Sequence, residues 1–398
     1  MRTVLFHVFI LIAVVCALTA CDHNSNDDDK ATDDDVMIGD DDVDETGNEG
    51  IAFNDPADDY EIWVGGGRPN ELDDGILLHY KNGYWKEETL PYGTSFIRSL
   101  AMSSRKRGLA VTEDGKVLFY DGQSWKRDAE FDELIRYCTP LTAVATAEAE
   151  WLSCDNYVGS NKPNILVRRD NGWESSDTSL LRSGEIYSLR ASRNMVYGLG
   201  SSGGTFYYSD YSVFFNGNKQ RWEEQNEFYC NAPYVVLYDV AFLSADDGVA
   251  VGRCVDPPMS WRVAFQYKDG QWIMAPDIIN TFPYSIGRFT AAASDGVDMV
   301  IGGTSSFNNE ISGSFLMQFE QQQWSHLAGA DFLRHKILRL IYDDRGQLWS
   351  VGYLMEGEKS WRTGFVSRFI DDHWEDMKLP LLATDRWYLE EIVVFTPE

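Results

Sequence analysis

The stretch Val117-Leu118-Phe119-Tyr120-Asp121-Gly122-Gln123-Ser124-Trp125 decides the fold. Four apolar residues precede an Asp-Gly pair, which favours a tight hairpin turn, and a tryptophan follows the turn. Six other segments of the chain repeat this order of apolar run, turn and late tryptophan. The seven tryptophans are Trp85, Trp125, Trp173, Trp222, Trp272, Trp324 and Trp374, spaced by 40, 48, 49, 50, 52 and 50 residues.

Two further apolar segments lie upstream of each hairpin. The nearer segment usually ends at glycine, as in Val249-Ala250-Val251-Gly252, and the farther segment alternates, as in Val235 to Phe242. Each unit therefore predicts four strands, called A to D here, in about 50 residues. Seven such units predict an all-β fold, a seven-bladed β-propeller of four-stranded blades. Two β-sandwiches would satisfy the same strand spacing.

The two ends of the chain predict how the ring closes. The first unit, from Glu61, contains strands B, C and D but no convincing A strand. The chain ends in one more strand pattern, Trp387 to Phe395, with no partner after it. We expect this C-terminal strand to complete the first blade and so remove an exposed sheet edge.

The repeated unit resembles the BNR/Asp-box class of bacterial repeats, within the wider group of WD40/YVTN-like propellers. That class carries Ser-x-Asp-x-Gly-x-x-Trp between strands C and D. Asp121 to Trp125 comes closest to it, with Tyr120 where the class has Ser near the Asp. The resemblance spans residues 61–398 and implies the architecture. Sialidases share this architecture, so a glycan-acting hydrolase or lyase is the alternative function, although the surroundings of Arg68 do not fit their arginine motif.

Residues 1–20 predict a lipoprotein signal peptide. An apolar run from Val4 to Leu18 follows a basic start and is too short for a comfortable membrane span. Leu18-Thr19-Ala20-Cys21 resembles the lipobox of bacterial lipoproteins. The resemblance implies that Cys21 is lipidated and becomes the first mature residue, with acyl chains that give a firm anchor. We expect a bacterial cell-envelope protein in the outer membrane, on its periplasmic side or at the cell surface, while Asp22 leaves the inner membrane possible.

Acidic residues concentrate just after Cys21. The formal net charge is −29, and residues 21–60 contain 14 Asp and 2 Glu with a single Lys. Such dense like charges predict a disordered tether between the lipid and the propeller domain. Ca²⁺ binding by the tether stays an open alternative, although no stretch matches a calcium-binding loop. The acidity argues against a nucleic acid partner, because no basic surface is available to displace counterions from phosphates.

Four cysteines remain in the propeller domain. Cys138 lies at the start of an A strand and Cys154 just after the following B strand, and Cys230 and Cys254 hold equivalent places two units later. The start of A lies beside the end of B in an antiparallel hairpin. We therefore predict the disulfides Cys138–Cys154 and Cys230–Cys254. A four-cysteine zinc site is the alternative, although the chain has no Cys-x-x-Cys pair.

Long connections between strands B and C predict the functional face. They run over residues 66–74, 155–164, 253–261, 304–314 and 353–361, and long varied loops on one face often carry function. Tolerated insertions on a rigid scaffold would give the same pattern. The candidate binding residues on these connections are Arg68, Asn70, Tyr157, Lys162, Trp261, Asn308, Asn309, Lys359 and Trp361.

No motif for an enzyme or a cofactor survives inspection. Gly198 to Gly204 matches both the dinucleotide-binding and the nucleophile-elbow patterns, but a strand pattern follows where both require a helix. We expect no catalytic residue, no metal and no cofactor. The sequence predicts a monomeric, non-catalytic propeller that binds an envelope protein or a polysaccharide, with Trp261 and Trp361 suggesting a glycan.

Overall fold

The computed structural model describes residues 60–397 with internal gaps. Cys21 and the acidic tether lie outside the described residues. The gaps are residues 69–73, 128, 135–137, 157–163, 170–171, 193–194, 204–207, 226–227, 231, 257–258, 276–277, 279–285, 308–309, 321–322, 328–331, 334, 357–360 and 381–386. Within the described part of the chain, no helix has the length and apolar character needed to cross a membrane.

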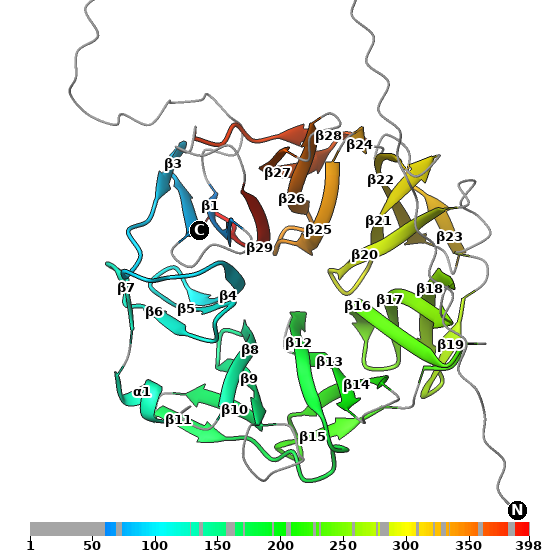
Figure 1. Cartoon of the computed structure of the whole chain (residues 1–398), viewed down its shortest axis with the longest axis horizontal. Helices are drawn as coiled ribbons and strands as arrows, with labels where there is room; N and C mark the ends of the chain where they lie inside the picture. The colour runs from blue at the N-terminus through cyan, green and yellow to red at the C-terminus, as the bar shows by residue number, and fades with distance from the viewer. Residues whose placement is uncertain are drawn as a thin grey trace, which may run out of the picture. The chain divides into compact units, whose positions relative to one another are not determined.

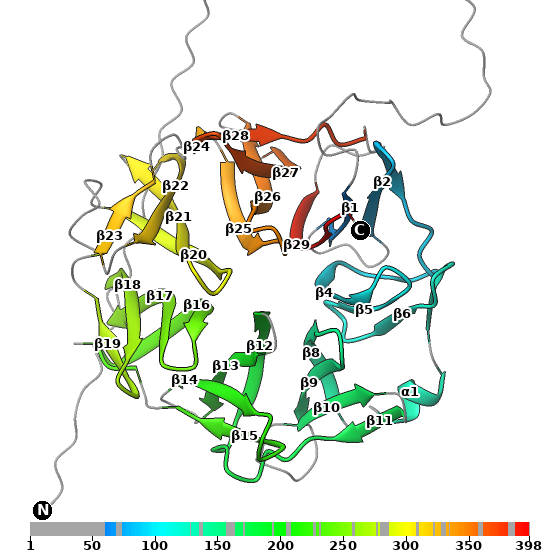
Figure 2. The same cartoon turned by 180° about the vertical axis from the view of Figure 1, so that it is seen from behind.

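The described residues form a ring of seven blades around a central axis (Figure 1; Figure 2). Each blade is a four-stranded antiparallel sheet whose A strand lines the axis and whose D strand lies outermost. The predicted seven-bladed propeller is therefore confirmed, and two sandwiches are excluded.

The strands of the first four blades follow in the order A, B, C, D. Blade 1 consists of β29 (Tyr388–Phe395), β1 (Glu61–Gly67), β2 (Gly75–Lys81) and β3 (Tyr84–Glu87). Blade 2 consists of β4 (Ile97–Ser104), β5 (Arg107–Thr112), β6 (Val117–Tyr120) and β7 (Trp125–Arg127). Blade 3 consists of β8 (Cys138–Ala145), β9 (Glu150–Asn156), β10 (Asn164–Arg169) and β11 (Gly172–Ser175). Blade 4 consists of β12 (Glu185–Ser192), β13 (Met195–Gly203), β14 (Tyr208–Asn216) and β15 (Arg221–Glu224).

The other three blades have longer strands. Blade 5 consists of β16 (Tyr234–Ser244), β17 (Asp247–Asp256), β18 (Met259–Lys268) and β19 (Gln271–Met274). Blade 6 consists of β20 (Ile286–Ser294), β21 (Met299–Phe307), β22 (Glu310–Glu320) and β23 (Gln323–His326), with the short β24 (Phe332–Leu333) added to β22. Blade 7 consists of β25 (His335–Tyr342), β26 (Leu348–Glu356), β27 (Trp361–Ile370) and β28 (His373–Asp376). A short helix, α1 (Ala129–Leu134), connects blades 2 and 3 and was not predicted.

Strand β29 closes the ring, as the sequence predicts. It pairs antiparallel with β1, so the last strand of the chain supplies the missing A strand of the first blade. Arg105 of blade 2 binds both ends, because its guanidinium donates to Glu61 Oε2 at 3.0 Å and to the carbonyl of Thr396 at 2.6 Å. The two chain ends are therefore joined by backbone pairing and by one shared side chain.

The repeated tryptophan has a common packing role. In six blades it lies directly opposite an aromatic residue of strand C, as Trp125 lies opposite Tyr120 with ring centroids 5.2 Å apart. In blade 3 the opposite residue is Arg168, whose guanidinium carbon lies 5.6 Å from the Trp173 ring centroid. Cross-strand aromatic pairs stabilise sheet edges, so the tryptophan fastens the short D strand to each blade.

Every A strand carries a β-bulge at the same place. The bulged residues are Glu390, Arg98, Leu141, Tyr187, Tyr238, Thr290 and Leu338 in blades 1 to 7. We call the next residue of each strand its ring position. The ring positions are Glu391, Ser99, Thr142, Ser188, Asp239, Ala291 and Arg339, and all seven are buried.

The ring positions link neighbouring blades. The hydroxyl of Ser99 in blade 2 donates to the carbonyl of Ala143 in blade 3, and the amide of Ala143 donates back to it, both at 3.0 Å. Asp239 in blade 5 accepts the amide of Ala292 in blade 6 at 3.1 Å. A bulge can aim a side chain out of its own ladder, and here it aims the ring position at the next blade.

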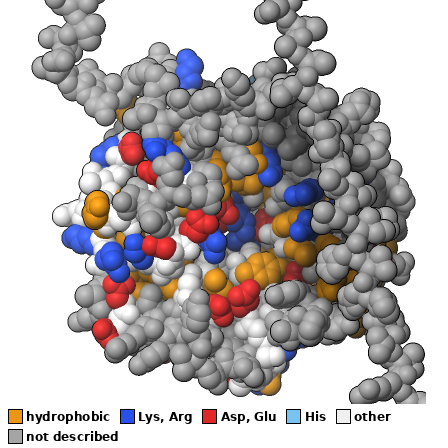
Figure 3. Space-filling model, viewed as in Figure 1, with side chains coloured by type: hydrophobic (Ala, Val, Ile, Leu, Met, Phe, Trp, Pro, Cys, Tyr) orange, Lys and Arg blue, Asp and Glu red, His pale blue; other side chains and the backbone are white. Residues whose placement is uncertain are grey.

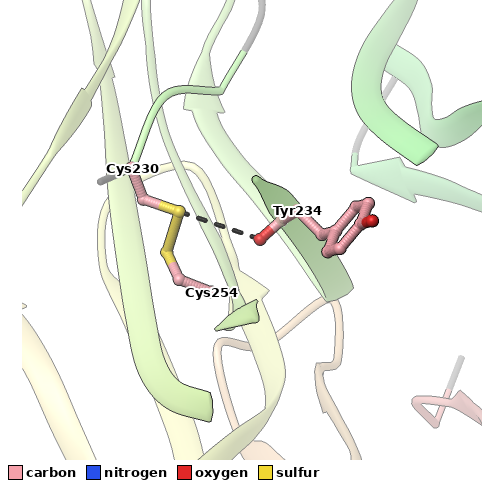
Figure 4. The surroundings of a disulfide bond; sticks show 3 residues. All are labelled: Cys230, Tyr234 and Cys254. Carbon is pink, nitrogen blue, oxygen red and sulfur yellow. Dashed lines mark hydrogen bonds between the residues drawn. A yellow bond between two sulfur atoms is a disulfide. The ribbon is translucent and has the colours of Figure 1, made fainter. Parts of the chain in front are cut away.

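One predicted disulfide is present. Cys230, just before β16, is bonded to Cys254 of β17, with their Cα atoms 6.4 Å apart (Figure 4). A bridge across a separation of 24 residues stabilises a fold by about 3 kcal/mol. Cys154 of β9 is buried and also disulfide-bonded. The side chain of its predicted partner, Cys138, lies outside the described residues, so that pairing stays a prediction.

Three predicted loops are largely strand. The connections predicted over residues 253–261, 304–314 and 353–361 contain the ends of β17 and β18, β21 and β22, and β26 and β27. Backbone pairing in these blades continues beyond the apolar core, for example from Gly252↔Val263 to Asp256↔Met259. The correction matters because Trp261 lies on a paired strand rather than on an irregular loop.

Candidate functional site

The two faces of the ring differ in what they carry. We call the face with the B–C and D–A connections the connection face, and the face with the A–B and C–D turns the turn face. The chain enters the propeller in a B strand, β1, and leaves it in an A strand, β29. The start of β1 and the end of β29 therefore both lie at the turn face. Glu61 and Phe395 are register partners at the turn face, so the tether joins the propeller there.

Few of the predicted binding residues fall on the described part of the connection face. Arg68 is described, and its Nη1 donates to Asp74 Oδ2 at 3.2 Å. Trp261 is described and is 38% exposed. Trp361 begins β27, but its side chain lies outside the described residues. The remaining candidates also lie outside them, namely Asn70, Tyr157, Lys162, Asn308, Asn309 and Lys359.

Trp261 belongs to a rigid corner of blade 5. It lies directly opposite Cys254, so both side chains leave the same side of the sheet. Cys254 is tied to Cys230, and the segment before Cys230 packs on that same side, with Phe228 4.7 Å from Trp272 between ring centroids. Tyr229, between Phe228 and Cys230, is 72% exposed. The disulfide therefore holds two exposed aromatic residues at one end of blade 5.

Exposed large apolar side chains favour the connection face. Four of the seven in the described part of the chain lie on its connections or strand ends, and the other three lie on D strands or on one A–B turn. The four are Tyr92, Leu180, Tyr229 and Trp261, with Tyr92 as much as 95% exposed. Tyr92 and Leu180 lie singly between other blades, so only Tyr229 and Trp261, which belong to the same blade, form a candidate interaction surface.

The channel carries a buried charge network that the sequence analysis missed. Arg339 of blade 7 donates from Nε to Glu391 of blade 1 at 3.1 Å, from Nη2 to the same carboxylate, and from Nη1 to Asp239 of blade 5 at 3.3 Å. Arg190 of blade 4 donates to the other oxygen of Asp239 at 2.8 Å. Blade 6 has Ala291 at its ring position, which leaves room for Arg339 to reach past it. Acidic and basic side chains surround the central opening in Figure 3.

A second group of acids lies toward the connection face of the channel. It comprises Glu113, Asp155, Glu185 and Glu390, with Arg98 among them, and we call it the acidic sector. Burial, and then the neighbouring Glu391, raise the pKa of Glu390 to about 8, while Arg98 and Arg190 oppose the rise. Burial, and then Asp155, also raise the pKa of Glu185. A carboxyl group that stays protonated near neutral pH can donate a hydrogen bond or a proton.

Replacing Glu390 with Gln is expected to stabilise the protein only at higher pH. The pKa of Glu390 is raised in the folded state, so ionisation favours the unfolded chain as the pH rises from about 4.5 to about 8. The free energy of unfolding of the variant should equal that of the wild type at pH 4 and exceed it by roughly 2 kcal/mol at pH 8.5. This difference is smaller than the full pKa shift implies, because the side chain keeps some contact with water. Urea unfolding across this range measures the difference. Exposed Glu87→Gln is the control, and a pH-independent effect at Glu390 would contradict the assignment.

The missed residues do leave a signal in the sequence. Charged residues interrupt otherwise apolar A strands at Asp239, Arg339 and Glu391. All three occupy the ring position, which becomes visible only when the strands are aligned on their bulges. Tyr229 leaves no such signal, because its place on blade 5 depends on the disulfide.

No group of three or more His, Cys, Asp or Glu side chains is placed to hold a metal ion within the described ranges. The carboxylates of the charge network are bonded to arginine.

Comparison with known proteins supports the fold alone. A crystal structure of a protein from Lactobacillus plantarum aligns with a TM-score of 0.52 and 10% identity, covering 83% of this chain and all of that one. The structure "YCF48 bound to D1 peptide" aligns with a TM-score of 0.48 and 14% identity over 74% of this chain and 85% of that one. The six-bladed fucose-binding lectin of Aleuria aurantia aligns with a TM-score of 0.39 and 10% identity, covering 70% and 93%. No family model and no curated protein matches the chain.

Proposed function

We propose that this protein is a non-catalytic binding module of the bacterial envelope. Lipidated Cys21 anchors it, and the connection face of the propeller binds an envelope protein or a polysaccharide. The observation that carries the proposal is the rigid corner of blade 5, where the Cys230–Cys254 disulfide joins the segment that carries exposed Tyr229 to the strand pair that carries exposed Trp261.

The rigidity of this corner favours binding. Trp261 is on a paired strand and Tyr229 adjoins a disulfide, so neither backbone has to be ordered when a partner arrives. Association then loses less conformational entropy than it would with mobile loops. Tryptophan and tyrosine are also among the residues that contribute most to binding energy at interfaces.

The places where the chain enters and leaves the propeller also favour the connection face as the binding face. The tether joins the propeller at the turn face, where Glu61 pairs with Phe395. Neither the entry of the chain at Glu61 nor its exit after Phe395 lies on the connection face, which carries Trp261 and Tyr229.

The charge network supports a role without catalysis. Asp239 and Glu391 are each bonded to an arginine, an arrangement that commits these two carboxylates to contacts between blades. One observation favours the alternative of a glycan-acting hydrolase. Glu390, whose pKa rises to about 8, lies within the acidic sector and could act as a general acid. Turnover of a glycan panel that is lost in Glu390→Gln would establish that alternative.

The first test of the proposal is crosslinking of the full-length, lipidated protein in the cells that produce it. We expect one recurrent partner or one glycan near stoichiometry, and at least tenfold less capture by Trp261→Ala with Tyr229→Ala, since hot-spot truncations cost about 2 kcal/mol or more. Tyr84→Ala is the matched control, because Tyr84 is 45% exposed but lies on the outer strand β3. Unchanged capture by the double variant, or no recurrent partner, would overturn the proposal.

A further inference from the structure

Blades 4 and 5 are the one pair of neighbouring blades, in the part of the chain that the structure describes, whose strands join into a single sheet. Strand β14 of blade 4 and strand β16 of blade 5 pair in parallel at Ser209↔Val235. Both strands begin at the connection face, because C and A strands run from that face toward the turn face. We call this place the blade 4–5 junction.

The junction leads directly to the rigid corner of blade 5. Val235 is also the register partner of Cys254 within that blade, and Cys254 is bonded to Cys230. Tyr229 precedes Cys230 in the chain, and Trp261 lies opposite Cys254. Blade 4 is therefore attached to the same short stretch of β16 and β17 that holds both exposed aromatic residues.

A buried carboxyl group bridges the junction. Asp210, the residue after Ser209 in blade 4, is 6% exposed. Its Oδ2 accepts the backbone amide of Leu237 in blade 5 at 2.7 Å and the hydroxyl of Tyr187 at 3.0 Å. The same hydroxyl lies 3.3 Å from the carbonyl oxygen of Leu237. Carboxyl group, phenol and peptide group thus form one cluster that spans the two blades.

Asp210 has no basic partner among the described residues. It differs in this from Asp239 and Glu391, whose carboxylates are bonded to arginine. A buried carboxylate without a cation is unfavourable, because a few hydrogen-bond donors do not replace its hydration. Burial accordingly raises the pKa of Asp210 to about 6, although its hydrogen bonds oppose the rise.

The other titratable groups that face Asp210 do not supply the missing positive charge. Tyr187 stays a neutral donor, because burial and then the neighbouring Asp210 raise its pKa well above the usual value. Glu185 is itself acidic, and its charge adds to the rise in the pKa of Asp210. Asp239 lies close enough to act on Tyr187, but its carboxylate is bonded to Arg190.

We propose that Asp210 is a proton-sensitive latch that sets how firmly blade 4 holds the rigid corner of blade 5. In the protonated form, Oδ2 still accepts from Leu237 and Tyr187, and no charge is buried. In the ionised form, local opening of the junction is favoured, because opening returns the carboxylate to water. The inference goes beyond the proposed function, since it concerns how the fold responds to pH rather than what the corner binds.

The direction of the pH response follows from the raised pKa of Asp210. A group whose pKa is higher in the closed state stabilises that state fully below its ordinary pKa, which is 3.8 here. This stabilisation is lost as the pH rises toward about 6, and further increases in pH add little. The junction is therefore held most firmly in mildly acidic solution.

The test is hydrogen exchange of the full chain, read at the amide of Leu237 and its neighbours in β16. Each rate is divided by that of an unstructured peptide of the same sequence, which removes the intrinsic effect of pH. We expect protection of residues 235–238 to fall by about tenfold between pH 4.5 and pH 7.5 and then to level off. Strand β4 is the internal control, because the Ser99 hydroxyl makes its contact with the next blade and does not titrate.

Three variants distinguish a latch from general loosening. Asp210→Asn keeps an oxygen that can accept the same two donors, so protection should stay high at every pH. Glu185→Gln should lower the midpoint without removing the transition. Tyr187→Phe takes a donor from the carboxylate and should move the midpoint to higher pH, which keeps the inference testable if Asp210→Asn fails to fold.

Two outcomes would overturn the latch. One is protection of residues 235–238 that does not depend on pH in the wild type. The other is an unchanged pH dependence in folded Asp210→Asn. Neither outcome bears on the proposed function, which is tested by capture through Trp261 and Tyr229. The absence of a cellular partner would refute the proposed function and would leave the exchange result intact.

Discussion

Replacing Arg339 with Met is expected to lower the free energy of unfolding by about 3–5 kcal/mol, the cost of removing one partner of a buried ion pair. Arg339 is the only described side chain that bonds to both Glu391 and Asp239, and both carboxylates are buried. Without it, Glu391 loses its bidentate partner and stays buried in blade 1. Asp239 keeps Arg190 and two backbone donors, so most of the cost falls on Glu391. Urea or thermal unfolding measures the loss.

Two further variants separate burial from pairing. Arg127→Met makes the same change at a surface pair, where Arg127 lies 2.9 Å from Asp132 and is 45% exposed, and it should cost less than about 1 kcal/mol. The double variant Arg339→Met with Glu391→Leu removes both buried partners and should recover much of the stability, since a buried ion pair can often be replaced by apolar residues. Equal losses at Arg339 and Arg127 would show that the network adds nothing beyond a surface pair.

A chain that stops before Trp387 is expected to yield no folded monomer. The truncation removes Trp387, Leu389 and Ile392, which are all buried, and leaves the inner edge of β1 unpaired. Burial of these three side chains contributes about 5–9 kcal/mol, which is comparable to the whole stability of a typical domain. The unpaired edge also invites association with other chains. Soluble yield, gel filtration and circular dichroism report the outcome.

A permuted chain shows whether the strand or the chain end matters. Glu61 and Phe395 are register partners, so a two-residue turn can join the end of residues 387–395 to Glu61 as an ordinary A–B hairpin. We expect this permutant to fold like the wild type. A chain lacking only Pro397 and Glu398 should also fold, because both follow β29. A soluble, folded chain without β29 would contradict the proposed dependence on closure.

The sequence predicts the architecture well because the deciding signals are local and repeated. Trp125 and its counterparts mark the D strands through pairing with a residue only a few positions away. The closure by Trp387 to Phe395 follows from counting strands. The first unit has only three strands and the C-terminal strand has no unit of its own, so pairing the two completes seven four-stranded blades. Cys230–Cys254 follows from the geometry of a single hairpin.

The candidate site is less predictable because it depends on contacts between blades. Trp261 is found from composition, but its rigid setting requires the length of β17 and β18, which turn residues alone do not reveal. The partners of Arg339 lie 52 and 100 positions away, at Glu391 and Asp239. Their meeting depends on bulges in three separate strands and on the small side chain of Ala291 between them. No local pattern encodes such a combination.

Closure of the ring by β29 also means that the first blade stays incomplete for most of the synthesis of the propeller. Strand β1 is among the first parts of the propeller to be made, while β29 begins more than 300 residues later, at Tyr388. At about 5–20 residues per second, β1 waits on the order of 15–65 seconds for its inner neighbour. During that interval six blades can form while the first keeps an open edge. Until residues 388–395 are available, the inner edge of β1 can pair with another chain, so a chain interrupted late in synthesis would keep an edge that favours association.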